Sequence, residues 1–216
     1  LENAEDFDMA VHDLIKEYMT AHQRIIFNGD GYSDEWVKEA ERRGLPNIRC
    51  MIDAAGTLTT EKSVRLFEKF GIFTKAELIS REEIIYETYA KTLNIEALTM
   101  INMANKKIIP AVIRYSKSLA DTVIAVKDAG ADASVQRDIL NTVSSKLITA
   151  KNALLRLEEA TAQAGTIKSA KDKAFFYKDT VKVEMDALRK PVDELELVVD
   201  KSMWPMPTYG DLTFEV

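Results

Sequence analysis

The two histidines are the first side chains to consider for metal binding. His12 and His22 lie ten residues apart in a single predicted helix. An α-helix rises about 1.5 Å per residue, so the two imidazoles are separated by roughly 15 Å along the axis. They cannot share a metal ion unless the helix bends, and we expect surface or capping roles. The single cysteine, Cys50, excludes an intrachain disulfide and supplies no metal-ligand spacing, so we expect a reduced, partly buried side chain.

A phosphate site is the second possibility, at the glycine-rich turn of residues 28–31 (NGDG). A helix start is predicted just after it, at Ser33, and free backbone amides at such a start can bind phosphate. The turn lacks the glycine spacing and the lysine of a P-loop, and it does not match the dinucleotide-binding pattern. We therefore favour a structural turn. A nucleotide site that depends on Gly31 is a weaker hypothesis than either of the two functions considered at the end of this section.

Charged pairs are the third set of candidates, and they occur at Glu82-Glu83, Glu158-Glu159, Lys106-Lys107 and Arg42-Arg43. All are predicted to lie on exposed helix faces, where charge usually serves solvation. A serine, histidine and acid arrangement is not indicated, because both histidines lie in one helix with no nucleophile marked out. The residues alone therefore predict no catalytic, cofactor-binding or metal-binding residue.

The composition is that of an ordinary globular protein. Of 216 residues, 46% are hydrophobic and 30% are charged, which argues against disorder and allows a substantial core. A net charge of −6 without a long basic block argues against a nucleic-acid partner. We find no apolar run long enough for a membrane span and no secretory signal, and we expect a cytoplasmic protein. The first residue is Leu1, which is expected of a processed or excised chain.

Short helices are predicted in the first part of the chain. Residues 3–22 and 33–44 have apolar side chains at helical spacing, and the turn described above separates them. Residues 47–79 are predicted to form an irregular connector with one short helix. Capping-box spacing occurs twice, from Thr74 and from Ser80, so the next helix begins at one of these positions.

Three long amphipathic helices are predicted next, over residues 80–128, 134–163 and 169–199. Pro110 and Pro191 should kink the first and third helices or break their hydrogen-bond ladders. Short links that contain glycine favour an antiparallel bundle around a shared core. The expected core residues are Leu98, Ile101, Ile108, Val112, Leu119, Val123, Val126, Val135, Ile139, Val143, Leu147, Leu154, Leu157, Ala174, Tyr177, Val181, Leu188, Leu195 and Val199.

The ending of the chain differs from the helices before it. Pro205 and Pro207 impose an extended course, and the Tyr209-Gly210-Asp211 sequence indicates a turn. Trp204 and Phe214 carry too much apolar surface to stay in water. We therefore expect an extended tail that docks through these two aromatic residues, either on its own bundle or on a neighbouring chain.

Four segments carry a resemblance to a known family. They are residues 24–45 (RIIFNGDGYSDEWVKEAERRGL), 94–104 (NIEALTMINMA), 110–121 (PAVIRYSKSLAD) and the ending WPMPTYGDLTFEV. Together they resemble the C-terminal region of type III glutamine synthetases, the large bacterial form of that enzyme. The resemblance covers nearly the whole chain, and the ending is its most specific part. Met206 and Thr213 stand there in place of leucines, a mild departure.

The resemblance implies that the parent protein is a glutamate–ammonia ligase, which uses ATP and magnesium or manganese. The metal-binding glutamates, ammonium-site residues and most nucleotide contacts of the family precede the part represented here. No catalytic residue is therefore carried over, and this chain alone is expected to be inactive and without a cofactor of its own. The resemblance also implies a homo-dodecamer, whose partners are the rest of the polypeptide and the neighbouring subunits, with no nucleic acid and no membrane.

These expectations combine into a predicted all-α chain. Residues 1–46 end the catalytic domain, 47–79 form the connector, 80–200 form an antiparallel bundle of three long kinked helices, and 201–216 form the docked, extended tail. The expected function is to contribute to the stability or assembly of a glutamine synthetase. The alternative is a free-standing helical protein-interaction module with no enzymatic activity.

Overall fold

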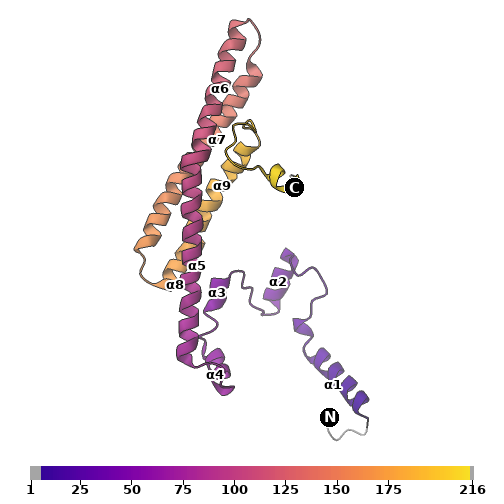
Figure 1. The fold of residues 1–216 in the computed structure, drawn as a ribbon. Coiled ribbons are helices and arrows are strands. Elements are labelled where there is room, and N and C mark those ends of the chain that lie inside the picture. Colours follow the sequence, from indigo (N-terminus) through magenta and orange to yellow (C-terminus); the bar gives the residue numbers. More distant parts are fainter. Residues whose placement is uncertain (1–5, 215–216) are drawn as a thin grey trace. The chain divides into compact units, whose positions relative to one another are not determined.

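The computed structural model describes residues 6–214, which form helices joined by turns. These residues contain no strand, and the predicted all-α class is confirmed. The chain divides between Asp53 and Ala54 into two compact units, and the short helix α3 (Met51–Ala55) spans the boundary. The first unit carries α1 and α2, and the second carries the long helices (Figure 1).

Helix α1 (Phe7–Ala21) begins at Asp6, whose carboxylate accepts a hydrogen bond from the Met9 amide at 3.1 Å. This N-cap satisfies an amide that has no partner within the helix. The local signals for a helix are therefore in place, yet no residue of α1 is buried. Val11 and Leu14 are half-buried, and five other large apolar residues stay more than half exposed, namely Phe7, Met9, Ile15, Tyr18 and Met19.

Helix α2 (Asp34–Arg42) follows a 3-10 turn (Gln23–Ile25) and the NGDG segment. It begins at Ser33, whose hydroxyl accepts a hydrogen bond from the Trp36 amide at 3.3 Å. Ala40 is the buried residue of this helix. Two acidic residues in its first turn and a basic residue in its last turn match the direction of the helix dipole.

The second unit begins with α4 (Glu61–Lys69) and the much longer α5 (Lys75–Met103). The hydroxyl of Thr74 accepts a hydrogen bond from the Glu77 amide, and the Glu77 carboxylate accepts one from the Thr74 amide at 2.7 Å. This reciprocal capping box satisfies two backbone donors. The long helix therefore starts at the earlier of the two predicted positions and not at Ser80.

A π turn (Ala104–Ile108) joins α5 to α6 (Ile109–Asp128), so that one helical rod continues through Pro110. Proline has no N–H for the carbonyl of Lys106, and in a regular α-turn its ring would press against that carbonyl. In the wider turn the Ile109 amide bonds to the carbonyl of Ala104, five residues back. The break in the hydrogen-bond ladder predicted at Pro110 is thus present as one wider, π-helical turn just before the proline.

The chain reverses into α7 (Ser134–Thr166) and then returns as α8 (Ala170–Phe176), a second π turn (Tyr177–Val181) and α9 (Lys182–Glu196) (Figure 1). α7 packs on α6 and on α9, and α8 packs on α5. The second π turn lies ahead of Pro191, and α9 is continuous through that proline.

The core of the second unit differs from the prediction at two positions. Leu98 and Val135 are 50% and 66% exposed, whereas Ala97 and Ala133 are buried. Small side chains let helix backbones approach closely, so Ala97, within α5, occupies a core position that hydrophobicity alone assigns to Leu98. Burial is confirmed for Ile108, Val112, Leu119, Val143, Leu154, Leu157, Ala174, Tyr177, Val181, Leu188, Leu195 and Val199, and Ile101, Val123, Val126, Ile139 and Leu147 are partly buried.

The tail is less extended than predicted, because α10 (Tyr209–Phe214) replaces the expected turn. The hydroxyl of Thr208 accepts a hydrogen bond from the Asp211 amide at 3.2 Å, and the Asp211 carboxylate accepts one from the Thr208 amide at 2.8 Å. This is a capping box with aspartate in place of glutamate, and it favours a helix start over an isolated turn.

Candidate functional site

Metal ligands are not grouped within residues 6–214, where no three His, Cys, Asp or Glu side chains come together in a way that could hold an ion. His12 contacts Asp13 at 3.3 Å, and His22 ends α1 while its ring meets the Tyr18 ring edge-on. Cys50 is half-buried with a free thiol. Across the same residues, no helix is both long and apolar enough to cross a lipid bilayer.

The NGDG turn uses its own polar groups. The carboxylate of Asp30 accepts a hydrogen bond from the Tyr32 amide at 2.9 Å, and the carbonyl of Asp30 accepts one from the Ser33 amide at 3.2 Å. The two residues that follow, Asp34 and Glu35, add negative charge to the first turn of α2. An incoming phosphate would meet three carboxylates near these amides, so the geometry supports a structural turn.

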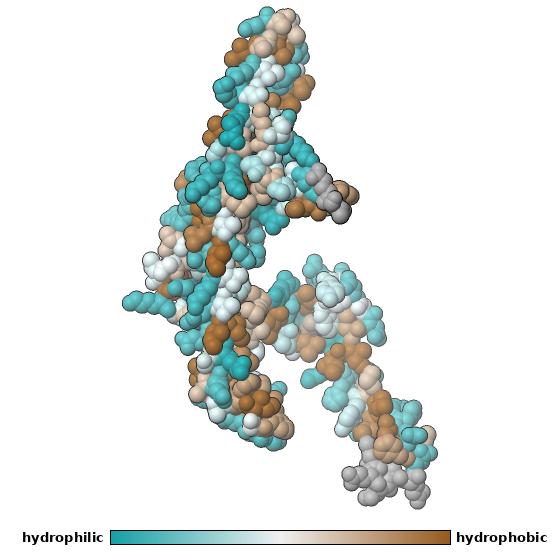
Figure 2. All heavy atoms as spheres, viewed as in Figure 1, coloured by the Kyte–Doolittle hydropathy of each residue, from teal (hydrophilic) through white to brown (hydrophobic). Residues whose placement is uncertain are grey.

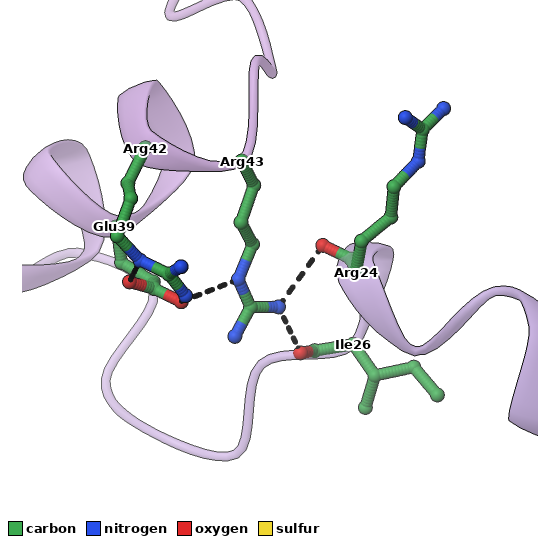
Figure 3. A network of polar contacts seen from close by, with 5 residues as sticks. All are labelled: Arg24, Ile26, Glu39, Arg42 and Arg43. Atoms are coloured by element: carbon green, nitrogen blue, oxygen red, sulfur yellow. Dashed lines mark hydrogen bonds and ion pairs between the residues drawn. The ribbon is translucent and has the colours of Figure 1, made fainter.

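Arg43 connects the segment after α1 to the end of α2 (Figure 3). Its Nη1 donates hydrogen bonds to the carbonyls of Arg24, at 3.0 Å, and Ile26. Its Nε donates to Oε1 of Glu39 at 2.6 Å, and Arg42 Nε donates to the other carboxylate oxygen at 2.6 Å. One guanidinium thus ties two backbone carbonyls to a side chain in α2. We call these five residues the arginine cluster.

Charge and burial distinguish the two arginines of this cluster. Hydrogen bonds from Arg42 and then from Arg43 lower the pKa of Glu39 from 4.5 to about 2. The side chain of Arg43 is 17% exposed and that of Arg42 is 72% exposed. The Arg43 guanidinium also lies 6.0 Å from the ring centroids of Phe27 and Trp36, which contact each other at 4.5 Å. The prediction that both arginines are surface residues is therefore wrong for Arg43.

Two of the paired glutamates also differ from a simple solvated face. Glu82 is half-buried and accepts a hydrogen bond from the Tyr86 hydroxyl at 3.0 Å. Glu158, in α7, is half-buried and accepts one from the Asn105 side chain at 2.7 Å. Because Asn105 belongs to the first π turn, this bond fastens that irregular turn to the neighbouring helix.

A pocket of about 360 Å³ lies between the tail and the helices of the second unit. We call it the tail pocket. Its lining is mostly apolar and comes from α5, the first π turn, α9 and the tail itself. The lining residues are Met100, Met103, Ala104, Ile108, Leu188, Arg189, Val192, Asp193, Glu196, Trp204, Met206, Pro207, Tyr209 and Leu212.

Polar contacts fasten the tail over this pocket. The Arg189 guanidinium donates to the Tyr209 hydroxyl at 2.5 Å, and the Glu196 carboxylate accepts a hydrogen bond from the Tyr209 amide at 2.9 Å. Lys201 pairs with Asp211, and this hydrogen bond, ahead of those from Thr208, holds the pKa of Asp211 well below its usual range.

The two aromatic residues predicted to dock the tail behave differently. Trp204 is 7% exposed and belongs to the core of its own bundle, as one of the two predicted docking modes requires. Phe214 is 82% exposed, so docking of this residue on its own chain is contradicted. Of these two aromatic residues, only Trp204 reaches the core.

Comparison with known proteins gives matches to glutamine synthetases in each case reported below. Residues 10–127 match the family described as the glutamine synthetase C-terminal domain. The glutamine synthetase of Butyrivibrio fibrisolvens is 36% identical over 208 residues, which cover 95% of this chain and 30% of that protein. The glutamine synthetase of Bacteroides fragilis (strain YCH46) is 30% identical, over 96% of this chain and 29% of that protein. The type-3 glutamine synthetase of Dictyostelium discoideum is 31% identical, over 95% and 29%. This chain spans about 30% of the length of these relatives.

Proposed function

Because this chain belongs to the family of glutamine synthetase C-terminal domains, we propose that it is the non-catalytic C-terminal region of a glutamine synthetase. In this proposal it contributes to the stability or assembly of an enzyme that ligates ammonia to glutamate in the cytoplasm, with ATP and magnesium or manganese. Within residues 6–214 no cluster of side chains fits such a metal ion, and we assign no step of the ligase reaction to them.

The observation that carries the proposal is the open apolar face of α1. Five of its large apolar residues are more than half exposed. Figure 2 shows hydrophobic side chains on the surface of this helix. A short helix is marginal in water unless its apolar face is covered, and a contiguous apolar patch usually marks an interface. This chain matches only about 30% of the length of its relatives, so the rest of a glutamine synthetase is the natural surface to cover it.

The proposed roles follow the predicted segments. Residues 1–46 complete the catalytic domain, residues 47–79 connect it, and residues 80–200 form the added helical element. The remainder of the polypeptide and the neighbouring subunits of a homo-dodecamer are the proposed partners. The exposed side chains of Leu212 and Phe214 at the end of the docked tail support a contact of this kind.

A chimaera tests the proposal. This chain replaces the matching C-terminal region of the Butyrivibrio fibrisolvens glutamine synthetase, and subunit assembly and γ-glutamyl transfer are measured. We expect the chimaera to assemble and turn over, and Ile15→Asp to abolish assembly by placing a charge in the covered face of α1. Glu17→Ala, on the opposite, polar side of the same helix, is the matched control.

Three results would contradict the proposal. ATP-dependent γ-glutamyl transfer by this chain alone would place catalytic residues within it. Normal assembly of the Ile15→Asp chimaera would show that the face of α1 is not an interface. Normal assembly and turnover of the relative after simple deletion of the matching region would favour the free-standing interaction module.

A further inference from the structure

A second pocket in the bundle gathers positive charge. It has a volume of about 360 Å³ and lies where α5, the C-terminal end of α7 and the start of α8 meet. Three lysines line it, Lys91, Lys168 and Lys173, against a single acid, Glu87. This local excess of positive charge stands out in a chain whose net charge is −6. We call it the lysine pocket.

Among the three lysines of this pocket, Lys91 is the one that forms an ion pair. Lys91 pairs with Glu87 at 2.8 Å, and this hydrogen bond is the main cause of the lowered pKa of Glu87. Lys168 and Lys173 have no carboxylate within ion-pair distance in the described part of the chain, and Lys173 is half-buried beside Tyr177 in the pocket wall. Both ammonium groups can therefore bind a ligand, and Lys173 also attracts Glu87 at longer range, which contributes to the lowered pKa of Glu87.

A neutral hydrogen-bond donor, the side-chain amide of Asn94, lies in the same pocket. The hydroxyl of Tyr177, a residue that is 3% exposed, donates a hydrogen bond to Oδ1 of Asn94 at 2.8 Å. Because the oxygen of the Asn94 carboxamide is engaged by this buried hydroxyl, its Nδ2 group is left to donate. In this arrangement Nδ2 of Asn94 is the end of the carboxamide that can donate to an acceptor.

Small residues leave room beside these donors. Ala90, Ala164 and Gly165 line the pocket, and a Cβ added at Gly165 would meet no atom within 4 Å. The volume lies within the range of pockets that hold small molecules. Charge, an oriented donor and space thus occur together at the end of the bundle.

We propose that the lysine pocket binds a small dianion, either a phosphate group or a dicarboxylate. Lys168 and Lys173 supply charge-assisted hydrogen bonds to its two negative charges, and Nδ2 of Asn94 supplies a third. The competing explanation is that the lysines merely balance Glu87 and the negative end of the α7 dipole. Binding at this pocket is independent of whether the chain is part of an active ligase.

Isothermal titration calorimetry of this chain at constant ionic strength tests the site, with inorganic phosphate and succinate as separate probes. Two or three charge-assisted contacts support one saturable site with a Kd on the order of 1 mM for at least one probe. Saturation by phosphate alone assigns a phosphate group, and saturation by succinate alone assigns a dicarboxylate. Absence of saturation with both probes would overturn the proposal.

Variants locate the binding. Lys168→Gln and Lys173→Gln should each raise the Kd about tenfold, because each removes one charge-assisted contact. Asn94→Asp, nearly unchanged in shape, should abolish binding by adding a negative charge, with an unchanged melting temperature as the check on folding. Lys171→Gln, an exposed lysine of α8 outside the pocket lining, should leave the Kd unchanged. Equal weakening by Lys171→Gln would show diffuse surface attraction and reject the site.

Discussion

The two units of the chain have equally clear helix signals and very different interiors. α1 and α2 have side-chain N-caps at Asp6 and Ser33, as α5 has at Thr74, yet α1 buries nothing. The second unit has a continuous core from α5 to Trp204. The first unit is instead held by the arginine cluster and its aromatic contacts. Local signals determine where a helix starts, but they do not determine whether the helix has a partner within its own chain.

Paired core substitutions test this contrast most strongly. Leu154→Ala, at a side chain that is 0% exposed, should cost about 3–5 kcal/mol of unfolding free energy, because a cavity is left in the bundle. Ile15→Ala in α1, at a side chain that is 57% exposed, should cost less than about 0.5 kcal/mol. Urea unfolding followed by circular dichroism measures both. Equal losses would show that α1 is packed in solution and would break the contrast.

The tail offers the second comparison. Trp204→Ala should lower the unfolding free energy by about 3 kcal/mol, because it removes a large side chain that is 7% exposed. Phe214→Ala, at an exposed aromatic residue of the same tail, should change it by less than about 0.5 kcal/mol. Thermal unfolding at several protein concentrations checks this. A concentration-dependent loss for Phe214→Ala would indicate that this residue docks on a neighbouring chain.

The arginine cluster should stabilise only the first unit. Arg43→Ala removes hydrogen bonds to two carbonyls. It should therefore lower the free energy of local opening of residues 23–43 by about 1–2 kcal/mol. Amide hydrogen exchange resolves this from the bundle, where protection should not change. Arg43→Lys should not restore it, since an ammonium cannot form the same fork. Arg42→Ala is the matched control and should have the smaller effect; the reverse order would contradict the role assigned to Arg43.

The start of α5 distinguishes the two candidate capping boxes. Thr74→Ala should cost about 1 kcal/mol, because the Glu77 amide loses its side-chain acceptor. Ser80→Ala, inside the same helix, should be nearly neutral. Chemical denaturation compares the two variants, and a larger loss for Ser80→Ala would move the helix start to the later position.

Glu39 should make the smallest, pH-dependent contribution. Its pKa in the folded chain is about 2, below the ordinary 4.5, so the folded state keeps the carboxylate ionised in more acidic solution. The stabilisation is therefore complete above the ordinary pKa and is lost as the pH falls from about 4.5 towards 2. Carboxyl chemical shifts in an NMR titration report this pKa, and Arg42→Ala should raise it. An unshifted pKa would remove Glu39 as a source of pH-dependent stability.

Much of the architecture could be predicted from residue patterns. The caps at Ser33 and Thr74 and the disturbance at Pro110 each depend on a few neighbouring residues, and each is present in the structure. The helical start at Tyr209 also had a local signal, the Thr208 to Asp211 spacing, which the prediction of a turn overlooked.

Other features had no local signal. The alternation of large and small apolar residues did not indicate that Ala97 would be buried in preference to Leu98, because that choice depends on how closely a second helix approaches. The sequence Arg42-Arg43 likewise does not indicate which arginine turns inward, since the carbonyls that Arg43 binds lie 17 and 19 residues away.

The sequence by itself therefore determined the all-α class, most helix limits and the family, since these depend on short-range patterns and on residue identity. Only the tertiary structure decided that Trp204 enters the core while Phe214 stays exposed, and that Lys168 and Lys173 meet Asn94 in one pocket. The physical reason is that burial and charge clustering depend on distances between segments far apart in the chain. The packing of α5, α7 and α8 sets those distances, and no single segment encodes them.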